Sequence, residues 1–224
     1  MAAAPRWSAV LWDLDGTIVD SAPGITATLA WTFERLGMPI PSPTEMLAWV
    51  GPPLLDAFRE LAGLDEAAAQ EALAVYRGRY REVGVFQATP YPGVPGFLRE
   101  LHARGVPTSL ATSKPESLAR AILEREGLLG ELDVITGASE DERRSAKADV
   151  VALALERLGA AGFDASRPVL IGDRHHDVAG AAERGVPTIF VTWGYGAPEE
   201  AAGSVAIVHD VDELRGELAL PPLE

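Results

Sequence analysis

Short apolar runs recur along the chain, and each ends in a polar residue that is followed by a turn. The runs are Ala9–Trp12 before Asp13, Thr108–Ala111 before Thr112, Val169–Gly172 before Asp173, and Thr188–Val191 before Thr192. Apolar runs of this length, bounded by turn residues, are typical of strands that are buried on both faces of a parallel sheet. The pattern therefore predicts four parallel strands with polar side chains at their ends.

Segments with helical periodicity separate these runs. One begins at Ser113–Pro115, with proline in the first helical turn, and stops at Gly127; others run from about Ser145 to Gly159 and from about His176 to Gly185. Alternating strands and helices favour an α/β fold with a Rossmann-like three-layer core, in which helices cover both faces of the sheet. Ligands of such folds bind beyond the carboxyl ends of the strands, where the polar residues gather.

Residues 18–87 interrupt this alternation. They contain several helical stretches, such as Ser21–Gly37 and Asp65–Val83, and no convincing strand. We therefore expect a helical domain of residues 18–87, inserted into a core domain of residues 1–17 and 88–224.

Composition and charge narrow the possible functions. The 224 residues are 47% hydrophobic and 23% charged, as in an ordinary globular protein. A formal charge of -14 disfavours nucleic acid and anionic membranes as partners, so a phosphate substrate would need a locally positive pocket. The absence of cysteine excludes disulfides, thiolate zinc sites and cysteine nucleophiles. We find neither a signal peptide nor about 18 consecutive apolar residues, so we expect a cytoplasmic protein.

Two carboxylates follow the first predicted strand, in the sequence Asp13-Leu-Asp15-Gly-Thr17. Residues two apart in an extended chain point to the same side, so both can enter one pocket. Adjacent like charges raise each other's proton affinity unless a divalent cation with oxygen ligands compensates. One carboxylate can then act as a nucleophile while its neighbour carries a proton. The alternative interpretation is a hairpin turn, which Asp-Gly also favours.

A hydroxyl group stands at the end of the second predicted strand, in Thr112-Ser113-Lys114. Together with the backbone N–H groups of a helix start, it offers donors for phosphate oxygens. Ser113 can also serve simply as the helix cap.

The chain contains two lysines, Lys114 and Lys147, beside seventeen arginines. A compact ammonium group can neutralise both an attacking carboxylate and phosphoryl oxygens. A solvated surface charge is the ordinary alternative for a lysine at a helix start.

Two more acids, Asp173 and Asp177, follow the third predicted strand and flank His175 and His176. The histidines suggest a transition metal, but neighbouring residues on a turn point apart, and hard oxygen ligands suit magnesium better. We therefore expect the histidines to be exposed loop residues.

The motif of Asp13 and Asp15, taken with Thr112, Lys147 and Asp173, resembles the haloacid-dehalogenase superfamily. The resemblance covers almost the whole chain and is greatest to the phosphoglycolate-phosphatase-like branch, which carries a helical (C1-type) cap. It implies that Asp13 is the nucleophile and Asp15 the general acid and base. Dehalogenases proper lack the second aspartate, so its presence favours phosphoryl chemistry.

The resemblance also implies the remaining roles. Thr112 binds the substrate phosphate, with Ser113 or Lys114 close by, and Lys147 is catalytic. The implied metal is Mg²⁺, and its expected ligands are Asp13, the backbone carbonyl of Asp15, and Asp173. Asp177 binds the metal through water or supports its ligands. The inserted helices then form a cap that carries specificity for a small phosphorylated metabolite.

Several alternatives stay open at this point. A phosphomutase, β-phosphoglucomutase-like, would use the same Asp13 intermediate, and a non-catalytic phosphate-binding protein would keep the fold without turnover. No Gly-x-x-x-x-Gly-Lys-Ser/Thr loop exists, which disfavours a nucleotide-driven kinase. The segment Gly194–Glu200 resembles a stretch of the same branch, although a loop shaped by glycines also explains it. We expect a monomer or a homodimer.

Overall fold

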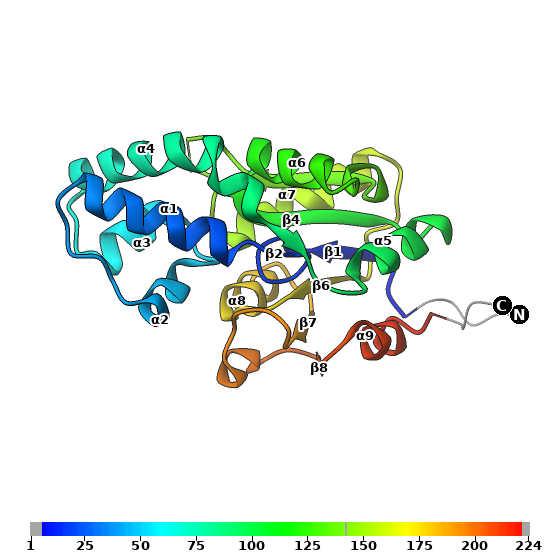
Figure 1. Ribbon diagram of the computed structural model, residues 1–224. Helices are drawn as coiled ribbons and strands as arrows, with labels where there is room; N and C mark the ends of the chain where they lie inside the picture. Colours follow the sequence, from blue (N-terminus) through cyan, green and yellow to red (C-terminus); the bar gives the residue numbers. More distant parts are fainter. Residues whose placement is uncertain (1–5, 142, 221–224) are drawn as a thin grey trace, which may run out of the picture.

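The computed structural model describes residues 6–141 and 143–220, so the predicted core segments extend beyond it at residues 1–5 and 221–224. A six-stranded sheet forms the centre of these residues, and every neighbouring pair of its strands is parallel (Figure 1). In spatial order the strands are β5 (Val134–Ala138), β4 (Thr108–Pro115), β1 (Ala9–Trp12), β6 (Pro168–Gly172), β7 (Thr188–Val191) and β8 (Ala206–Val208). The four predicted strands all lie in this sheet, and the α/β class is confirmed.

Helices cover both faces of the sheet. The core helices are α5 (Val94–Ala103), α6 (Glu116–Arg125), α7 (Lys147–Ala160), α8 (His175–Ala182) and α9 (Val211–Glu217), with two 3₁₀ turns, η3 (Leu129–Glu131) and η4 (Pro198–Ala201). Successive residues of β1 belong to opposite faces of the sheet, since Trp12 packs in the same cluster as Ile122 of α6, whereas Leu11 packs with Val150 of α7. The predicted three-layer core is therefore confirmed.

Further helices follow β1 in the sequence, before the remaining strands of the large sheet. In space they are grouped beyond one end of that sheet (Figure 1). They are α1 (Ala22–Arg35), α2 (Pro43–Met46), η1 (Leu47–Trp49), α3 (Leu54–Glu60), α4 (Glu66–Glu82) and η2 (Gly84–Gln87). Their core is aromatic: the Trp49 ring lies 5.4 Å from Phe33 and 5.2 Å from Phe58, both edge to face. We call these helices the insert. The two long helices predicted here correspond to α1 and α4.

The insert joins the core through two short antiparallel strands. These are β2 (Val19–Asp20) and β3 (Thr89–Pro90), with Val19 opposite Pro90. The expectation of no strand after residue 18 is therefore wrong at β2. Two residues are too few for an alternating pattern, and only tertiary pairing makes them a strand.

The boundary between β4 and α6 also differs from the prediction. The strand continues to Pro115, and α6 begins at Glu116 rather than at Ser113. Pro115 has an extended ψ of 131°, and proline disfavours helical backbone at the residue before it, here Lys114. Two strands, β5 and β8, were not predicted. Both lie at edges of the sheet, and β8 is only 3 residues long and partly exposed.

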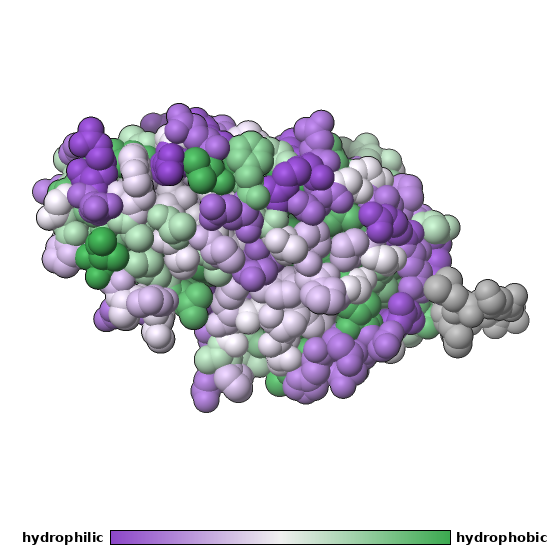
Figure 2. Space-filling view, in the orientation of Figure 1, coloured by the Kyte–Doolittle hydropathy of each residue, from purple (hydrophilic) through white to green (hydrophobic). Residues whose placement is uncertain are grey.

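Figure 2 shows hydrophilic side chains over most of the visible face, with hydrophobic ones in small, separate groups. Among the helices of the described segments, none has the length and hydrophobicity that a bilayer crossing requires.

Candidate active site

Three neighbouring strands end at one point beneath the insert. Trp12 of β1 stands opposite Leu110 of β4 and Ile171 of β6, so the next polar residues of these strands are neighbours. Those residues are Asp13, Thr112 and Asp173, and all three are buried. Parallel strands thereby bring together side chains that are as much as 160 residues apart in sequence.

Lys147, the first residue of α7, connects two of the predicted acids. Its ammonium group lies 2.6 Å from Asp13 Oδ1 and 2.7 Å from Asp177 Oδ1, and it donates to the Ala111 carbonyl at 3.0 Å. Burial raises the pKa of Asp13 to about 6, in spite of the lowering effect of Lys147. Burial alone would lower the pKa of Lys147, but the attraction of Asp13 and Asp177 raises it, so the ammonium stays charged.

Asp173 is completely buried. Its Oδ2 accepts a hydrogen bond from the Tyr195 backbone N–H at 2.7 Å, and its Oδ1 accepts one from the Thr17 hydroxyl at 3.2 Å. Burial, reinforced by the nearby charge of Asp177, raises the pKa of Asp173 well above its usual range. Asp177 itself is fixed by the backbone N–H groups of Asp173 and Arg174, at 3.1 and 3.0 Å.

These acids fit a hard divalent cation. One carboxylate oxygen each from Asp13, Asp173 and Asp177 lies within 4.8 Å of the others. Two of these three buried carboxylates, Asp13 and Asp177, share one ammonium, that of Lys147, so the cluster carries excess negative charge that a cation would compensate. Asp177 offers its oxygen to this group as directly as the other two do. The Asp15 carboxylate lies outside the group.

Asp15 instead pairs with Lys114. The Lys114 ammonium contacts both carboxylate oxygens, at 2.7 and 3.0 Å, and both side chains are buried. Burial would lower the pKa of Lys114, but the charge of Asp15 raises it. The same ammonium lies over the ring of Tyr80, 4.9 Å from its centroid. Because Tyr80 belongs to α4, the insert reaches the second carboxylate of the motif through Lys114.

A small cavity lies where the insert meets the strand ends. Its volume is about 40 Å³, enough for a few waters. The residues that line it include Asp15, Ile25, Trp49, Gly51, Tyr76, Arg77, Tyr80, Ser113 and Lys114. Ser113 is therefore close to Asp15, but it is not the cap of α6, whose N-cap residue is Pro115. The Thr112 hydroxyl accepts a hydrogen bond from the Lys114 backbone N–H at 3.2 Å.

The two histidines are placed differently from the expectation. They form the first turn of α8, not a loop, and their ring centroids are 3.7 Å apart, so the side chains do not diverge. His175 is exposed and His176 half-buried. Both line a groove of about 610 Å³ that also touches Ser113 and Lys147.

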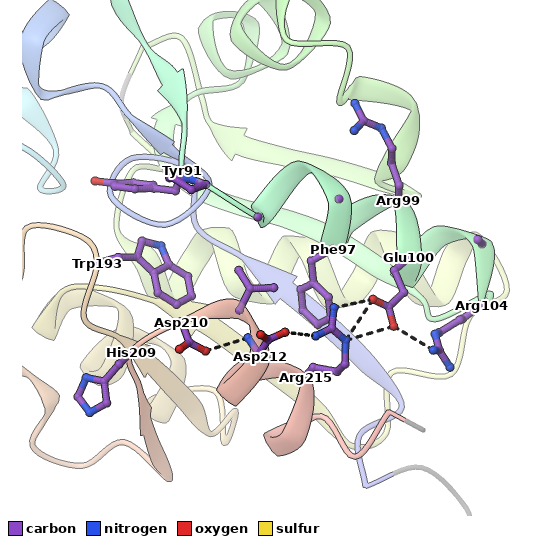
Figure 3. Close-up of a pocket in the computed structure, with 15 residues that line it drawn as sticks. Tyr91, Phe97, Arg99, Glu100, Arg104, Trp193, His209, Asp210, Asp212 and Arg215 are labelled. Atoms are coloured by element: carbon purple, nitrogen blue, oxygen red, sulfur yellow. Dashed lines mark hydrogen bonds and ion pairs between the residues drawn. The ribbon is translucent and has the colours of Figure 1, made fainter. Parts of the chain in front are cut away.

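A second open pocket, of about 1270 Å³, lies between α5, α9 and the segment after β7 (Figure 3). None of the eight predicted site residues lines it. Its charged groups are engaged with each other: Arg215 contacts Glu100 at 2.9 Å, and Glu100 also contacts Arg104 at 3.0 Å. We therefore do not assign the chemistry to this pocket.

Three residues near the site were not found from the sequence. Tyr80 faces Lys114, Tyr195 bonds to Asp173, and Arg174 donates to the Val50 carbonyl of the insert. Arg174 is held by Glu200 at 2.8 Å. The segment Gly194–Glu200, which the sequence comparison with the family had singled out, contains both Tyr195 and Glu200.

Known proteins similar to this chain agree with the geometry. The family model described as "Haloacid dehalogenase-like hydrolase" matches residues 10–191. A solved structure of a predicted phosphatase from Clostridium acetobutylicum superposes with a TM-score of 0.89 at 35% identity, covering 95% of this chain and 98% of that one.

Three of the similar curated proteins carry different names. "Tyrosine-protein kinase PtkA" of Mycobacterium tuberculosis is 38% identical over 94% of this chain and 72% of its own length. "5'-nucleotidase" of Pseudomonas aeruginosa is 37% identical over 88% of each chain, and "Phosphoglycolate phosphatase" of Rhodospirillum rubrum is 34% identical over 95% of this chain and 91% of its own length. The resemblance expected from the motifs is therefore confirmed: the chain belongs to the haloacid dehalogenase-like hydrolase family, and the proteins similar to it include named phosphatases.

Proposed function

We propose that the enzyme hydrolyses a small phosphomonoester in two steps, through a phosphoryl group carried on Asp13, with Mg²⁺ as its metal. The observation that carries this proposal is the pairing of the two motif carboxylates with different lysines, Asp13 with Lys147 and Asp15 with Lys114. The two lysines place these two aspartates, which are chemically the same, in different environments. Such a difference is what a nucleophile and a general acid require.

In the first step an oxygen of Asp13 attacks phosphorus, and Asp15 donates a proton to the departing alkoxide. The Lys147 ammonium, 2.6 Å from Asp13, neutralises charge on the attacking carboxylate and on the phosphoryl oxygens. The hydroxyl groups of Thr112 and Ser113 are the proposed donors to the phosphate.

In the second step Asp15 removes a proton from water, which attacks phosphorus and releases Asp13 with inorganic phosphate. In the resting protein Lys114 occupies both oxygens of Asp15. We infer that the substrate phosphate attracts this ammonium, which frees Asp15 to carry and transfer a proton.

Asp13, Asp173, Asp177 and the backbone carbonyl of Asp15 would hold the Mg²⁺. When bound, the ion supplies charge neutralisation for the phosphoryl oxygens and fixes their orientation. The chain's own contribution is to keep three carboxylate oxygens within 4.8 Å of one another in a buried setting.

We propose that residues 18–87 act as a cap domain over a core of residues 1–17 and 88–224. Contacts across this boundary support closure: Arg77 donates to the Glu140 carbonyl at 2.8 Å, and Arg81 pairs with its carboxylate at 3.1 Å. A closed cap keeps stray water from the acyl phosphate and selects the leaving group. Phosphoglycolate, a nucleotide or another small metabolite would be the substrate, in the cytoplasm.

The kinase name of one relative motivates a second candidate, phosphoryl transfer from a nucleotide to tyrosine. That relative is longer than the aligned region, which spans 72% of it. This chain has no phosphate-binding loop of the Gly-x-x-x-x-Gly-Lys-Ser/Thr kind. We therefore rank hydrolysis first and keep transfer as an outcome to be measured.

The decisive experiment is an assay of phosphate release from 4-nitrophenyl phosphate and a panel of phosphorylated metabolites, with and without Mg²⁺. We expect Mg²⁺-dependent hydrolysis, an acid-stable phosphoenzyme that hydroxylamine cleaves, and loss of both in Asp13→Asn. Asp149→Asn, which changes an exposed acid paired with Arg184, is the matched control.

Full activity of Asp13→Asn would refute the mechanism, and labelling of tyrosine from ATP without hydrolysis would favour the second candidate. A requirement for a sugar bisphosphate would identify a mutase.

A further inference from the structure

The segment after β7, Gly194–Glu200, is pressed against Asp173. A Cβ atom added to Gly194 would overlap the Asp173 carboxylate, and one added to Gly196 would overlap the Asp173 backbone carbonyl. Side chains are therefore excluded at both positions by close approach. Tyr195 lies between these glycines, so its backbone position is determined by contact with the acid.

Tyr195 makes contacts in two directions. Its backbone N–H donates to Asp173 Oδ2 at 2.7 Å. Its hydroxyl lies at the start of α1, where it accepts from the backbone N–H groups of Ser21 at 2.7 Å and Ala22 at 3.0 Å. The hydroxyl hydrogen is donated to Asp20 Oδ1 at 2.7 Å. One residue thus connects the buried acid of the core with the point where the insert begins.

At the start of helix α1 the N-cap side chain makes no capping bond, and the neighbouring Asp20 Oδ1 accepts from the Ala22 backbone N–H at 3.2 Å. The N-cap residue, Ser21, has φ −106° and ψ −3°. The Ser21 hydroxyl is buried and has no hydrogen-bond partner within the described residues. The first N–H groups of a helix need acceptors, and a serine at this position normally supplies one. Here the Tyr195 hydroxyl supplies it, from a segment 174 residues away.

The orientation of α1 bears on the active site. Ile25, one turn into this helix, lines the small cavity beside Asp15 and Lys114. The same helix packs against the end of α4, since a Cβ on Gly24 would overlap the Gly84 carbonyl that follows α4. A displacement of α1 would therefore move both the cavity wall and the helix that carries Tyr80.

We propose that Tyr195 is a positioning residue: its hydroxyl caps α1 and holds the insert in the closed arrangement over Asp15, while its backbone secures Asp173. The expected effect on KM rests on the proposed function, because it can be measured only with a substrate whose binding needs the closed insert. A looser insert lowers the fraction of binding-competent protein, and apparent affinity falls by that fraction. Saturating substrate restores closure, so turnover is preserved.

The test is Tyr195→Phe, which removes the hydroxyl and keeps the ring and the bond to Asp173. We expect KM to rise about fivefold, with kcat within twofold of the wild-type value. The Mg²⁺ dissociation constant, measured calorimetrically without substrate, should not change. Hydrogen exchange of the Ser21 amide, whose acceptor is the Tyr195 hydroxyl, should become at least tenfold faster. Trp193→Phe, which removes the indole bond to the Thr17 carbonyl just before this segment, is the control and should leave the Ser21 amide protected.

Other results would overturn the proposal. A lower kcat with unchanged KM would indicate a smaller folded fraction, and weaker Mg²⁺ binding would place the effect at Asp173. Unchanged exchange at Ser21 would show that the hydroxyl does not cap α1. If Tyr195→Phe does not fold, Asp20→Ala removes the acceptor of the hydroxyl hydrogen and should change KM and exchange in the same direction. Should the wild type hydrolyse no phosphate ester, the proposed function fails, but the exchange measurement still decides the capping role.

Discussion

The two lysines of the chain divide the active-site charge between them. Lys147 lies between Asp13 and Asp177, and Lys114 holds both oxygens of Asp15. All of these side chains are buried, so bulk solvent screens the pairs only weakly. Removal of one partner from a buried ion pair leaves an uncompensated charge, which affects both chemistry and stability.

Lys147→Gln should lower kcat by about a thousandfold, since it removes the cation that faces the attacking carboxylate. The measurement is phosphate release under saturating substrate and Mg²⁺. Arg184→Gln, at an exposed pair with Asp149, should retain wild-type turnover. A kcat for Lys147→Gln within tenfold of wild type would contradict the role assigned to this lysine.

At the level of elements, the insert contacts the core on two sides of the site. The loop between η1 and α3 offers the Val50 carbonyl to Arg174, and helix α4 reaches Glu140 through Arg77 and Arg81. Gly51, with φ +110°, lets the Arg174 side chain approach, because a Cβ there would lie 3.3 Å from its Cγ. Glu200 holds Arg174 in this position. Burial alone would raise the pKa of Glu200, but the hydrogen bonds from Arg174 and His175 outweigh burial and lower this pKa to about 2.

Arg174→Met should therefore destabilise the protein by about 3 kcal/mol, because it leaves Glu200 without its buried partner and frees the loop at Val50. Hydrogen exchange across residues 47–54 should accelerate at the same time. Urea unfolding and exchange mass spectrometry measure the two effects. The surface variant Arg59→Met, which loses pairs with Asp56 and Glu66, should cost under 1 kcal/mol; equal losses in both variants would argue against the Arg174 contact.

Across the whole molecule, the acid cluster couples metal binding to folding. The carboxylates of Asp13, Asp173 and Asp177 repel one another when no cation is present. A ligand that binds only the folded state stabilises it by about 2.7 kcal/mol at a hundred times its dissociation constant.

Mg²⁺ at that concentration should therefore raise Tm by roughly 5–10 °C for a chain of this size. In Asp173→Asn the shift should be absent, while Asp149→Asn should keep it. Differential scanning calorimetry with and without a chelator measures the shift. An equal Mg²⁺ response in Asp173→Asn would place the ion elsewhere.

The last helix, α9, is fastened to α5 by an ionic contact that responds to pH. Arg215 bonds to Glu100 at 2.9 Å, as the dashed lines of Figure 3 show, and this hydrogen bond lowers the pKa of Glu100. A carboxylate with a lowered folded-state pKa stabilises the protein above its unfolded-state pKa, and the contribution disappears as the pH falls toward the folded-state value.

Arg215→Ala should accordingly lower the free energy of unfolding by about 1 kcal/mol at pH 7. The difference from wild type should shrink below about pH 4.5, where Glu100 of the unfolded chain takes up its proton. Urea unfolding at several pH values measures it. A difference that stays constant down to pH 3 would assign the effect to lost packing on Phe97 instead.

Local pattern was sufficient for most of the fold. Buried apolar runs predicted β1, β4, β6 and β7, because a strand covered on both faces needs apolar side chains throughout. Edge strands and the two-residue pair β2 and β3 lack that requirement, so pattern alone did not reveal them. The start of α6 was predicted too early, since the effect of Pro115 on Lys114 outweighed the helical periodicity.

By itself, the sequence determined which polar residues follow the strands. It therefore also determined that Asp13, Thr112 and Asp173 lie together at the carboxyl ends of parallel strands. The period of an extended chain is a local property, so it can be read from neighbouring residues. Only the tertiary structure decided that Lys114 pairs with Asp15, that Asp177 joins the acids, and that Tyr195 caps α1. These contacts depend on side-chain direction across loops and on strand order, which no short stretch of sequence encodes.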